Sequence, residues 1–356
     1  MQRCDVIIIG GGIAGGSLAA KLSGHTDVVL LETEDTCGYH ATGRSAAMFE
    51  KYYGNDVVRT LAHSSEAELR AADVLTPRSV MVIADSADAH LMDAIIAEPD
   101  TRRLSIDEAI TMVPILRAEN IADVALEISG SDIDVDLLFQ GYLRRARANG
   151  AEIVTKAKVQ ALRYDGGWIA TTTQGDFSAP LVVNAAGAWA DEIATMAGVQ
   201  PLGVQPYRRS MALIAAPMGY DVSSWPMLLS ASESWYAKPD AGKWLVSPAE
   251  EDPIAPMDAW ADDMVLAEGL ARYQEFVIAP VTRVENSWAG LRSFAPDRTP
   301  VVGFDPAASG FFWLAGQGGY GVQTAPAISD LAAAQVLGAS FDKGIARALS
   351  AGRFNQ

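Results

Sequence analysis

The chain has 356 residues, which at roughly 150 residues per domain predicts about two domains. It carries 27 lysines and arginines against 44 aspartates and glutamates, a net charge of −17 that should repel nucleic-acid phosphates and anionic lipid. Hydrophobic residues make up 49%, which excludes disorder as the main state, and two cysteines cannot form a disulfide framework. No apolar run of about 20 residues suggests a membrane span. We therefore expect a cytoplasmic globular protein with no nucleic-acid partner and no membrane span.

The N-terminal segment has the pattern of a nucleotide-binding unit. The β-branched run Val6–Ile9 predicts a buried strand, and Gly10–Gly15 follows it with the pattern G-x-G-x-x-G. A helix is expected over 17–23 and a second strand over 28–31, which ends in Glu32. Because strand, helix and acid all stand at the required spacing, dinucleotide binding is favoured over a purely structural glycine turn.

Each part of this unit has a physical role in such binding. The first glycine permits a tight turn, the second lets the backbone approach a pyrophosphate, and the third lets the helix pack on the strand. The N–H groups at the helix start hold the anion, and the acid accepts hydrogen bonds from a ribose diol. We therefore predict cofactor contacts by Gly10, Gly12, Ile13, Ala14, Gly15 and Glu32.

Further along the chain, predicted helices and strands alternate without repeats or low-complexity tracts. A capping box of Ser105 and Glu108 predicts the start of one helix. No linker is visible, so the domains are expected to be interleaved. Helices are predicted over 59–72, 105–113, 136–149, 263–274 and after 321; strands are predicted over 79–84, 152–154, 158–162, 168–173, 181–183, 211–215, 243–247, 281–288, 300–303 and 311–316.

Five segments in this order resemble the D-amino-acid oxidase superfamily of FAD-dependent enzymes. They are Gly10–Glu32, Asn184–Trp189, Trp288–Arg292, Asp297–Gly303 and Gln317–Gly321. Within that superfamily the chain most resembles the bacterial FAD-dependent D-arginine dehydrogenases. Three further segments carry this narrower resemblance, which are Gly38–Ala47, Gln205–Ser210 and Tyr236–Gly242.

The resemblance implies an α/β fold with a Rossmann-like FAD-binding domain and an interleaved antiparallel-sheet substrate domain. The FAD-binding domain would take residues 1–75, 145–205 and 285–356, and the substrate-binding domain 76–144 and 206–284. FAD would be the non-covalent cofactor. The reaction would pass a hydride from the α-carbon of a D-amino acid to flavin N5, and the imino acid would hydrolyse to a 2-oxo acid and ammonia.

The resemblance also implies the residues that hold the substrate. Arg292 resembles the family's carboxylate clamp and Arg209 its second one, because a planar guanidinium holds a carboxylate with two charge-assisted bonds. A surface ion pair is the ordinary alternative for each arginine. Tyr53 and Tyr236 match tyrosines that offer an apolar wall and one hydroxyl, the alternative being half-buried core tyrosines.

Other segments match the residues that surround the flavin. Gly319 and Tyr320 open the last helix, so their N–H groups would meet the flavin pyrimidine ring and stabilise its negative charge when reduced. Gly319 is for that reason also a predicted catalytic residue. The remaining predicted cofactor contacts are Arg44, Ser45, Ala46, Ala186, Gly187, Trp189, Gly318 and Gly321.

Two departures from the D-arginine dehydrogenases bear on the substrate pocket. Val80 stands where those enzymes have the acid that holds a guanidinium, and Met48 stands where they have a histidine. A buried guanidinium without its carboxylate is costly, so neutral or apolar D-amino acids are expected. Glu50 supplies the missing charge from another direction, or else is a solvated loop residue.

Several alternatives stay open. His40 lies in a segment like one that carries covalent flavin in dimethylglycine dehydrogenases, but the nearer resemblance favours free FAD. No metal is expected, because His25, His63 and His90 have no partners at ligand spacing. The substrate is alternatively a secondary amine such as sarcosine, glycine, or a 2-hydroxy acid. A flavin scaffold and an NAD-only dehydrogenase are less favoured. The electron acceptor is either oxygen or a quinone-like compound, with a dehydrogenase preferred.

Overall fold

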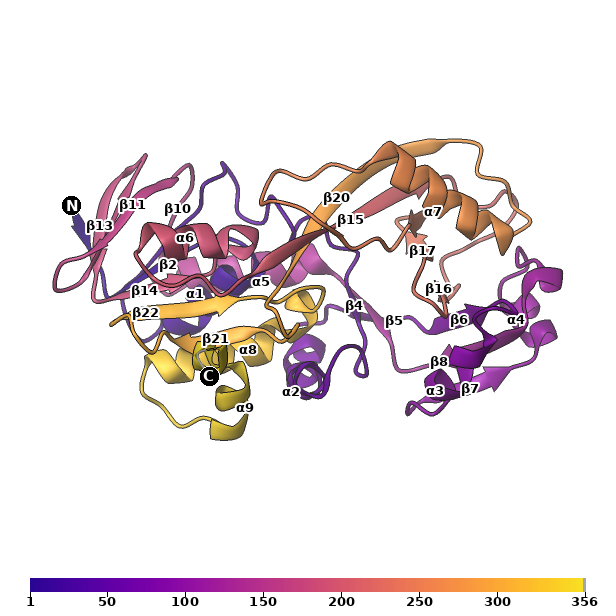
Figure 1. The fold of residues 1–356 in the computed structure, drawn as a ribbon, viewed down its shortest axis with the longest axis horizontal. Helices are drawn as coiled ribbons and strands as arrows, with labels where there is room; N and C mark the ends of the chain where they lie inside the picture. Colours follow the sequence, from indigo (N-terminus) through magenta and orange to yellow (C-terminus); the bar gives the residue numbers. More distant parts are fainter. Residues whose placement is uncertain (355–356) are drawn as a thin grey trace.

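The computed structural model describes residues 1–354 and has the mixed α/β fold that the sequence predicts. A mainly parallel sheet lies at the end of the molecule near both chain termini, and a larger mixed sheet lies at the other end (Figure 1). A long antiparallel ribbon of β15 (Gln205–Ile214) and β20 (Val284–Phe294) runs between the two ends. Within these residues no helix is long and apolar enough to cross a membrane.

The mainly parallel sheet has six strands in the order β10-β3-β2-β14-β22-β21, and only β21 is antiparallel to its neighbour. Strand β2 (Val6–Ile9), in the interior of this sheet, is buried on both faces. Its Ile8 packs with the helices on one side, and its Ile7 packs with a small sheet on the other. That double burial explains the β-branched run at the start of the chain. The strands are β2 (Val6–Ile9), β3 (Val28–Leu31), β10 (Glu152–Val154), β14 (Leu181–Asn184), β21 (Val301–Phe304) and β22 (Phe311–Ala315).

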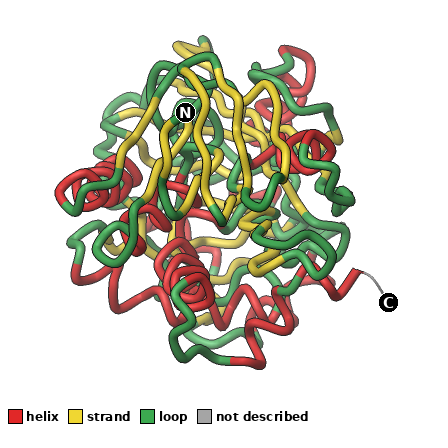
Figure 2. Tube along the Cα trace, turned by 90° about the vertical axis from the view of Figure 1, so that its left-hand side faces the viewer, coloured by secondary structure: helices red, strands yellow, loops and turns green. Residues whose placement is uncertain are grey.

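Helices cover one face of this sheet and strands cover the other. The helical face buries Leu18, Phe139 and Ile328 against the sheet, from α1 (Ile13–Leu22), α5 (Val135–Ala148) and α8 (Gly321–Val336), with α2 (Asp56–Ala71) beside them. Figure 2 looks onto this end of the molecule, with strands above and helices beside and below them. The opposite face packs on α6 (Ala190–Met196) and on a sheet of β1 (Gln2–Arg3), β11 (Val159–Tyr164), β12 (Trp168–Thr172) and β13 (Gly175–Ala179).

The larger sheet has nine strands, which come from two separate stretches of the chain. Its core contains the fully buried indoles of Trp235 and Trp244, covered by α7 (Asp263–Glu275) and α4 (Ile106–Met112). The strands besides β15 and β20 are β6 (Val80–Ala84), β7 (Thr101–Leu104), β8 (Asp123–Glu127), β16 (Met227–Ser230), β17 (Tyr236–Asp240), β18 (Lys243–Ser247) and β19 (Asp252–Pro253). The remaining helices are α3 (Met92–Ile96), α9 (Lys343–Leu349) and the 3-10 turns η1 (Ala89–Leu91), η2 (Ala118–Asn120), η3 (Gly187–Trp189) and η4 (Ala351–Phe354).

A three-stranded sheet lies between the two large ones. It consists of β4 (Met48–Phe49), β9 (Ser131–Ile133) and β5 (Leu75–Pro77), in the order β4-β9-β5. Asp132 in its middle strand pairs with Arg78 at 2.8 Å and with Lys238 of the larger sheet. These ion pairs fix the small sheet to the larger one.

Several predicted boundaries differ from the observed ones. Helix α1 begins at Ile13 rather than at 17, because Gly12 already takes the N-cap position. Helix α2 begins at Asp56, where the Asn55 side chain accepts a hydrogen bond from the Val58 N–H at 3.1 Å. The division into two domains stays a prediction, and α5, which the expected boundary at 144 divides, packs on α1 beside the parallel sheet.

Gly269 in α7 allows this helix to approach the chain after β18 closely, which gives a test of the packing. A Cβ at Gly269 would lie 2.3 Å from the Cβ of Pro248, whereas one at Gly141 in α5 would have Arg144 as its nearest neighbour, at 3.9 Å. We expect Gly269→Ala to lower the free energy of unfolding by about 1–3 kcal/mol through overpacking. The matched Gly141→Ala should raise it by about 0.5–1 kcal/mol. Calorimetric melting of both variants checks this, and an unchanged melting temperature for Gly269→Ala would contradict it.

Candidate active site

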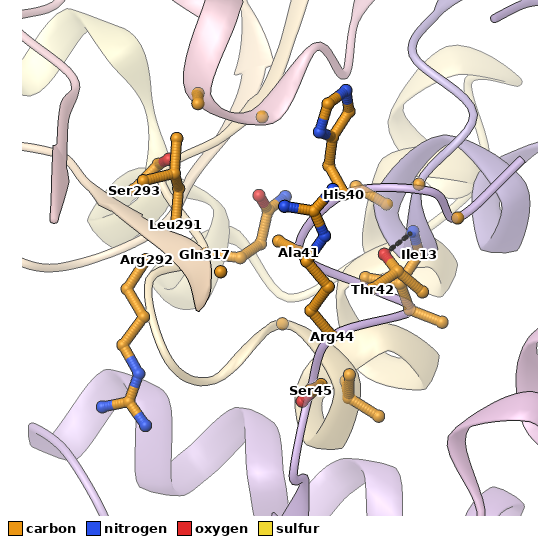
Figure 3. Close-up of a pocket in the computed structure, with 18 of the residues that line it drawn as sticks. Ile13, His40, Ala41, Thr42, Arg44, Ser45, Leu291, Arg292, Ser293 and Gln317 are labelled. Carbon is orange, nitrogen blue, oxygen red and sulfur yellow. Dashed lines mark hydrogen bonds between the residues drawn. The ribbon is translucent and has the colours of Figure 1, made fainter. Parts of the chain in front are cut away.

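One cavity of about 570 Å³ extends from the glycine turn before α1 to the β15–β20 ribbon. Most of the predicted site residues face it, although they come from both ends of the molecule. Figure 3 shows Arg292 on the opposite side of this cavity from Ile13 and Thr42. The predicted residues that line it are Gly10, Gly12, Ile13, Ala14, Glu32, Arg44, Ser45, Ala46, Met48, Glu50, Tyr53, Ala186, Gly187, Trp189, Arg209, Tyr236, Arg292, Gly318, Gly319 and Gly321.

The glycine turn is shaped by close backbone approach. Gly10 has a φ of +111°, and a Cβ there would lie 2.3 Å from the Ala185 carbonyl oxygen. A Cβ on Gly15 would lie 2.0 Å from the Gly10 carbonyl oxygen, so Gly15 serves the contact of helix with strand and does not line the cavity. Gly12 faces the cavity at the N-cap of α1. The turn therefore presents a backbone surface and a helix N-terminus, which suit a pyrophosphate.

Glu32 faces the cavity with its carboxylate already oriented. Its Oε2 accepts a hydrogen bond from the Gly11 N–H at 2.8 Å, and its Oε1 accepts one from the Glu34 N–H at 2.9 Å. Each carboxylate oxygen has further lone pairs, so the group can also accept bonds from a diol. The neighbouring Cys37 thiol has its pKa raised to about 11 by burial and by the Glu32 charge, which keeps it protonated.

The segment around Arg44 is fixed by contacts that leave its backbone beside the cavity. The Arg44 guanidinium pairs with Asp258 at 2.5 Å and donates to the Ala259 carbonyl at 2.8 Å. The indole N–H of Trp288 donates to the Arg44 carbonyl at 3.1 Å. His40 lies 3.0 Å from the Glu34 carboxylate through its Nε2. The Arg44 guanidinium is thus paired with Asp258, so a ligand in the cavity would contact the backbone of this segment rather than the Arg44 guanidinium.

The register of the β15–β20 ribbon brings the two predicted arginines together. Tyr207 pairs directly with Arg292, and Arg209 pairs with Gly290. Directly paired residues project to the same face of a sheet, as do residues two positions apart, so both guanidiniums project from one face. Both line the cavity. The positive charge of Arg292 adds to burial in lowering the pKa of Arg209.

The two arginines have different partners. Arg292 donates to the Tyr53 hydroxyl at 3.3 Å, and a Cβ on Gly319 would lie 3.2 Å from its guanidinium. Arg209 donates to the Glu250 carbonyl at 2.9 Å and contacts the Glu251 carboxylate at 3.4 Å. Arg292 has no carboxylate partner within 4 Å among the described residues, so a ligand carboxylate can bind it without displacing a salt bridge.

The tyrosines and methionines form an apolar wall near these arginines. Tyr236 is 6% exposed, and its hydroxyl donates to the Met211 sulfur at 3.2 Å, a weak acceptor that a ligand can replace. Met48, Met227 and Leu229 complete this wall. Among the described residues, the arrangement places the Arg292 guanidinium, which has no carboxylate partner there, beside an apolar surface.

Besides Gly15, two predicted contacts differ in the structure. Val80 does not line the cavity, because it lies inside β6, 1% exposed, and packs in the apolar cluster behind the wall. Tyr320 does not line it either, since its ring packs 5.1 Å from that of Tyr53 and its N–H donates to the Gln317 carbonyl at 2.9 Å. The Gly318 N–H likewise donates to Ser293 at 2.9 Å. Neither N–H group is free for a flavin ring.

Two glutamines that the sequence did not single out also face the cavity. The side-chain nitrogens of Gln317 and Gln323 are buried, and neither has a hydrogen-bond partner among residues 1–354. Buried donors without partners are costly, so each suits a ligand acceptor. Together with the glycine turn and Glu32 they fit a large, polar cofactor such as FAD. Within the described residues no cluster of three or more His, Cys, Asp or Glu is arranged to hold a metal.

The chain is similar over most of its length to known oxidoreductases. The chain is 27% identical over 355 residues to the glycine oxidase of Geobacillus kaustophilus, with 91% of this chain and 90% of that one covered. The crystal structure of a glycine oxidase from the same organism covers 96% of each chain, with a TM-score of 0.83 and 25% identity. Human mitochondrial dimethylglycine dehydrogenase is 26% identical over 90% of this chain, which spans 41% of that longer protein.

A more distant structure shares the fold. The dithionite-reduced L-α-glycerophosphate oxidase of Mycoplasma pneumoniae, solved with FAD bound, superposes with a TM-score of 0.84 at 17% identity over 95% of each chain. The profile of the family described as FAD dependent oxidoreductase (DAO) matches residues 5–335. The chain therefore belongs to the DAO family of FAD-dependent oxidoreductases, and FAD is its cofactor.

Proposed function

We propose that this protein oxidises the α-carbon of an amino acid, with D-amino acids of neutral or apolar side chain as the preferred substrates. A hydride passes from the α-carbon to flavin N5, and the imino acid hydrolyses to a 2-oxo acid and ammonia. The observation that carries the proposal is the Arg292 guanidinium, which faces the cavity beside Tyr53 and Gly319 without a carboxylate partner within 4 Å among the described residues.

The chain's own residues divide the work of holding such a substrate. Arg292 binds the α-carboxylate through a planar pair of donors, and the Tyr53 hydroxyl limits how the guanidinium turns. Arg209 adds positive charge from the same face of the ribbon. The wall of Met48, Met211 and Tyr236 excludes water and receives an apolar side chain. FAD, when bound, supplies the two-electron acceptor.

The pocket supports a neutral substrate over a guanidinium-bearing one. Val80 and Met48 stand where the resemblance to D-arginine dehydrogenases calls for an acid and a histidine, and both pack in an apolar cluster. The narrower likeness to those enzymes stays a prediction. Non-covalent FAD is part of the proposal too: His40 is paired with Glu34.

A second candidate is the oxidation of glycine or of a secondary amine such as sarcosine. It is favoured by the likeness of this chain to a glycine oxidase and to a dimethylglycine dehydrogenase. Such a substrate uses the same Arg292 anchor and leaves the apolar wall unfilled. A 2-hydroxy acid is a third candidate on the same anchor.

An anaerobic titration separates these candidates. The purified protein, with its visible flavin spectrum recorded, receives D- and L-amino acids, glycine, sarcosine and a 2-hydroxy acid one at a time. We expect neutral D-amino acids to bleach the oxidised-flavin band fastest, because they fill the apolar wall. Faster bleaching by sarcosine or glycine would favour the second candidate, and a band that persists through the panel would contradict the proposal. Repeating the best substrate with oxygen or a quinone as acceptor distinguishes oxidase from dehydrogenase.

The carboxylate anchor is tested by Arg292→Ala. Removing one partner of a buried charged pair is expensive, so we expect kcat/KM to fall by about 10²–10³-fold while the flavin spectrum is retained. Arg102→Ala, at an exposed position on β7, is the matched control and should behave as the wild type. Rapid-scanning measurement of anaerobic flavin reduction gives both values. Near-wild-type reduction by Arg292→Ala would show that the carboxylate binds elsewhere.

A further inference from the structure

Glu50 is a carboxylate that the fold holds at the cavity without a partner. It directly follows β4, whose Phe49 is fully buried, and its backbone N–H donates to the Gln323 side chain at 2.9 Å. Its side chain lines the cavity together with Arg292 and Tyr53. Within residues 1–354 its carboxylate has no hydrogen-bond partner and no ion-pair partner. A fixed backbone and an unpaired acid on a cavity wall are the features of a ligand-binding group rather than of a solvated loop residue.

The charges around Glu50 favour the binding of a cationic group beside its carboxylate. Burial raises its pKa to about 7, and the carboxylates of Glu127 and Glu233 add to the rise. Arg292 and Lys238 oppose it, but Lys238 is held by Asp132. A positively charged ligand group would therefore offset the cost of ionising the buried Glu50 carboxylate and the repulsion by its acidic neighbours.

We propose that the Glu50 carboxylate contacts the protonated nitrogen of the substrate and accepts its proton. The proposal rests on the function proposed above, in which Arg292 binds the carboxylate of the same molecule. The carboxylate of a zwitterionic substrate would then contact Arg292 on β20, and its ammonium group would contact Glu50 after β4, within the same cavity. Glu50 would thus complete the recognition of an amino acid, whose two charged groups need opposite partners.

The proton transfer is what prepares the nitrogen for oxidation. An N–H bond of the ammonium breaks, an O–H bond forms on Glu50, and the electron pair stays on nitrogen. That pair would form the C=N bond as the α-carbon loses a hydride, for which FAD, when bound, would supply the two-electron acceptor, and the substrate would become an iminium ion. A base with a pKa near the working pH serves such a transfer best, and Arg209 and Arg292 both favour release of the proton from a nearby ammonium.

Binding of two matched ligands tests the contact without turnover. Trimethylglycine and 3,3-dimethylbutyrate have the same shape and the same carboxylate, and only the first carries a positive charge. Titrated against the flavin spectrum of the FAD-loaded protein at pH 8.5, the wild type should bind trimethylglycine at least about 10-fold more tightly than 3,3-dimethylbutyrate, which lacks the cationic nitrogen. Glu50→Gln should bring the two affinities together, while Glu268→Gln, at an exposed position on α7, keeps the preference. The same preference in Glu50→Gln as in the wild type would overturn the proposal.

The pH dependence of flavin reduction tests the proton transfer. Glu50 accepts a proton only when ionised, so wild-type kcat/KM should fall as the pH drops below about 7. We expect Glu50→Gln to be about 10²–10⁴-fold slower at pH 7 and to recover most of that loss at pH 10, where the amine is already neutral in solution. An equal loss at every pH would mean a structural role and would overturn the transfer. A wild type that oxidises no amine would contradict the proposed function instead, and the ligand pair would still decide the contact.

Discussion

The antiparallel pairing of β15 with β20 is the constraint on which the candidate site depends. Its register, from Gln205 opposite Phe294 to Ile214 opposite Val284, joins the two large sheets and sets which side chains share a face. A slip of one residue would place Arg209 and Arg292 on opposite faces of the ribbon, so that only one of them could face the cavity. The site therefore depends on the register of a ribbon, and on backbone hydrogen bonds along ten or more residues of each strand rather than on any local loop.

The cavity joins two kinds of surface with different physical tasks. Its cofactor end is built from close backbone contacts, in which Gly10 and Gly15 leave no room for a Cβ. Its proposed substrate end carries Arg292 on one wall and Glu50 on another, and neither has an ion-pair partner within residues 1–354. A surface formed by the backbone suits a large molecule that stays bound, because such a molecule makes many contacts that are individually weak. Unpaired charges suit a small molecule that must arrive and leave.

The sequence predicts the first kind of surface better than the second. The strand, glycine turn, helix and Glu32 are local in the chain, and their spacing alone specifies the geometry. The length of β15 was missed, since Pro206, Arg208 and Arg209 interrupt its apolar pattern; of these, Arg209 lines the cavity and Arg208 pairs with Asp252. Val80 and Tyr320, which the resemblance places at the site, pack in apolar clusters and do not line the cavity. Gln317 and Gln323 carry no pattern at all, and only burial reveals their unpaired nitrogens.

The interleaved order of strands has a consequence for how the chain acquires its structure. Strand β14 lies between β2 and β22, so its second neighbour is synthesised only after residue 311. In the larger sheet β6 likewise waits for β16, which begins at Met227. These pairings are distant in sequence, so the loop-closure entropy is high and folding is slow compared with local topologies. A nascent chain that has reached the end of β14 exposes the apolar edge of an unfinished sheet, which makes β22 the strand that protects this edge from aggregation.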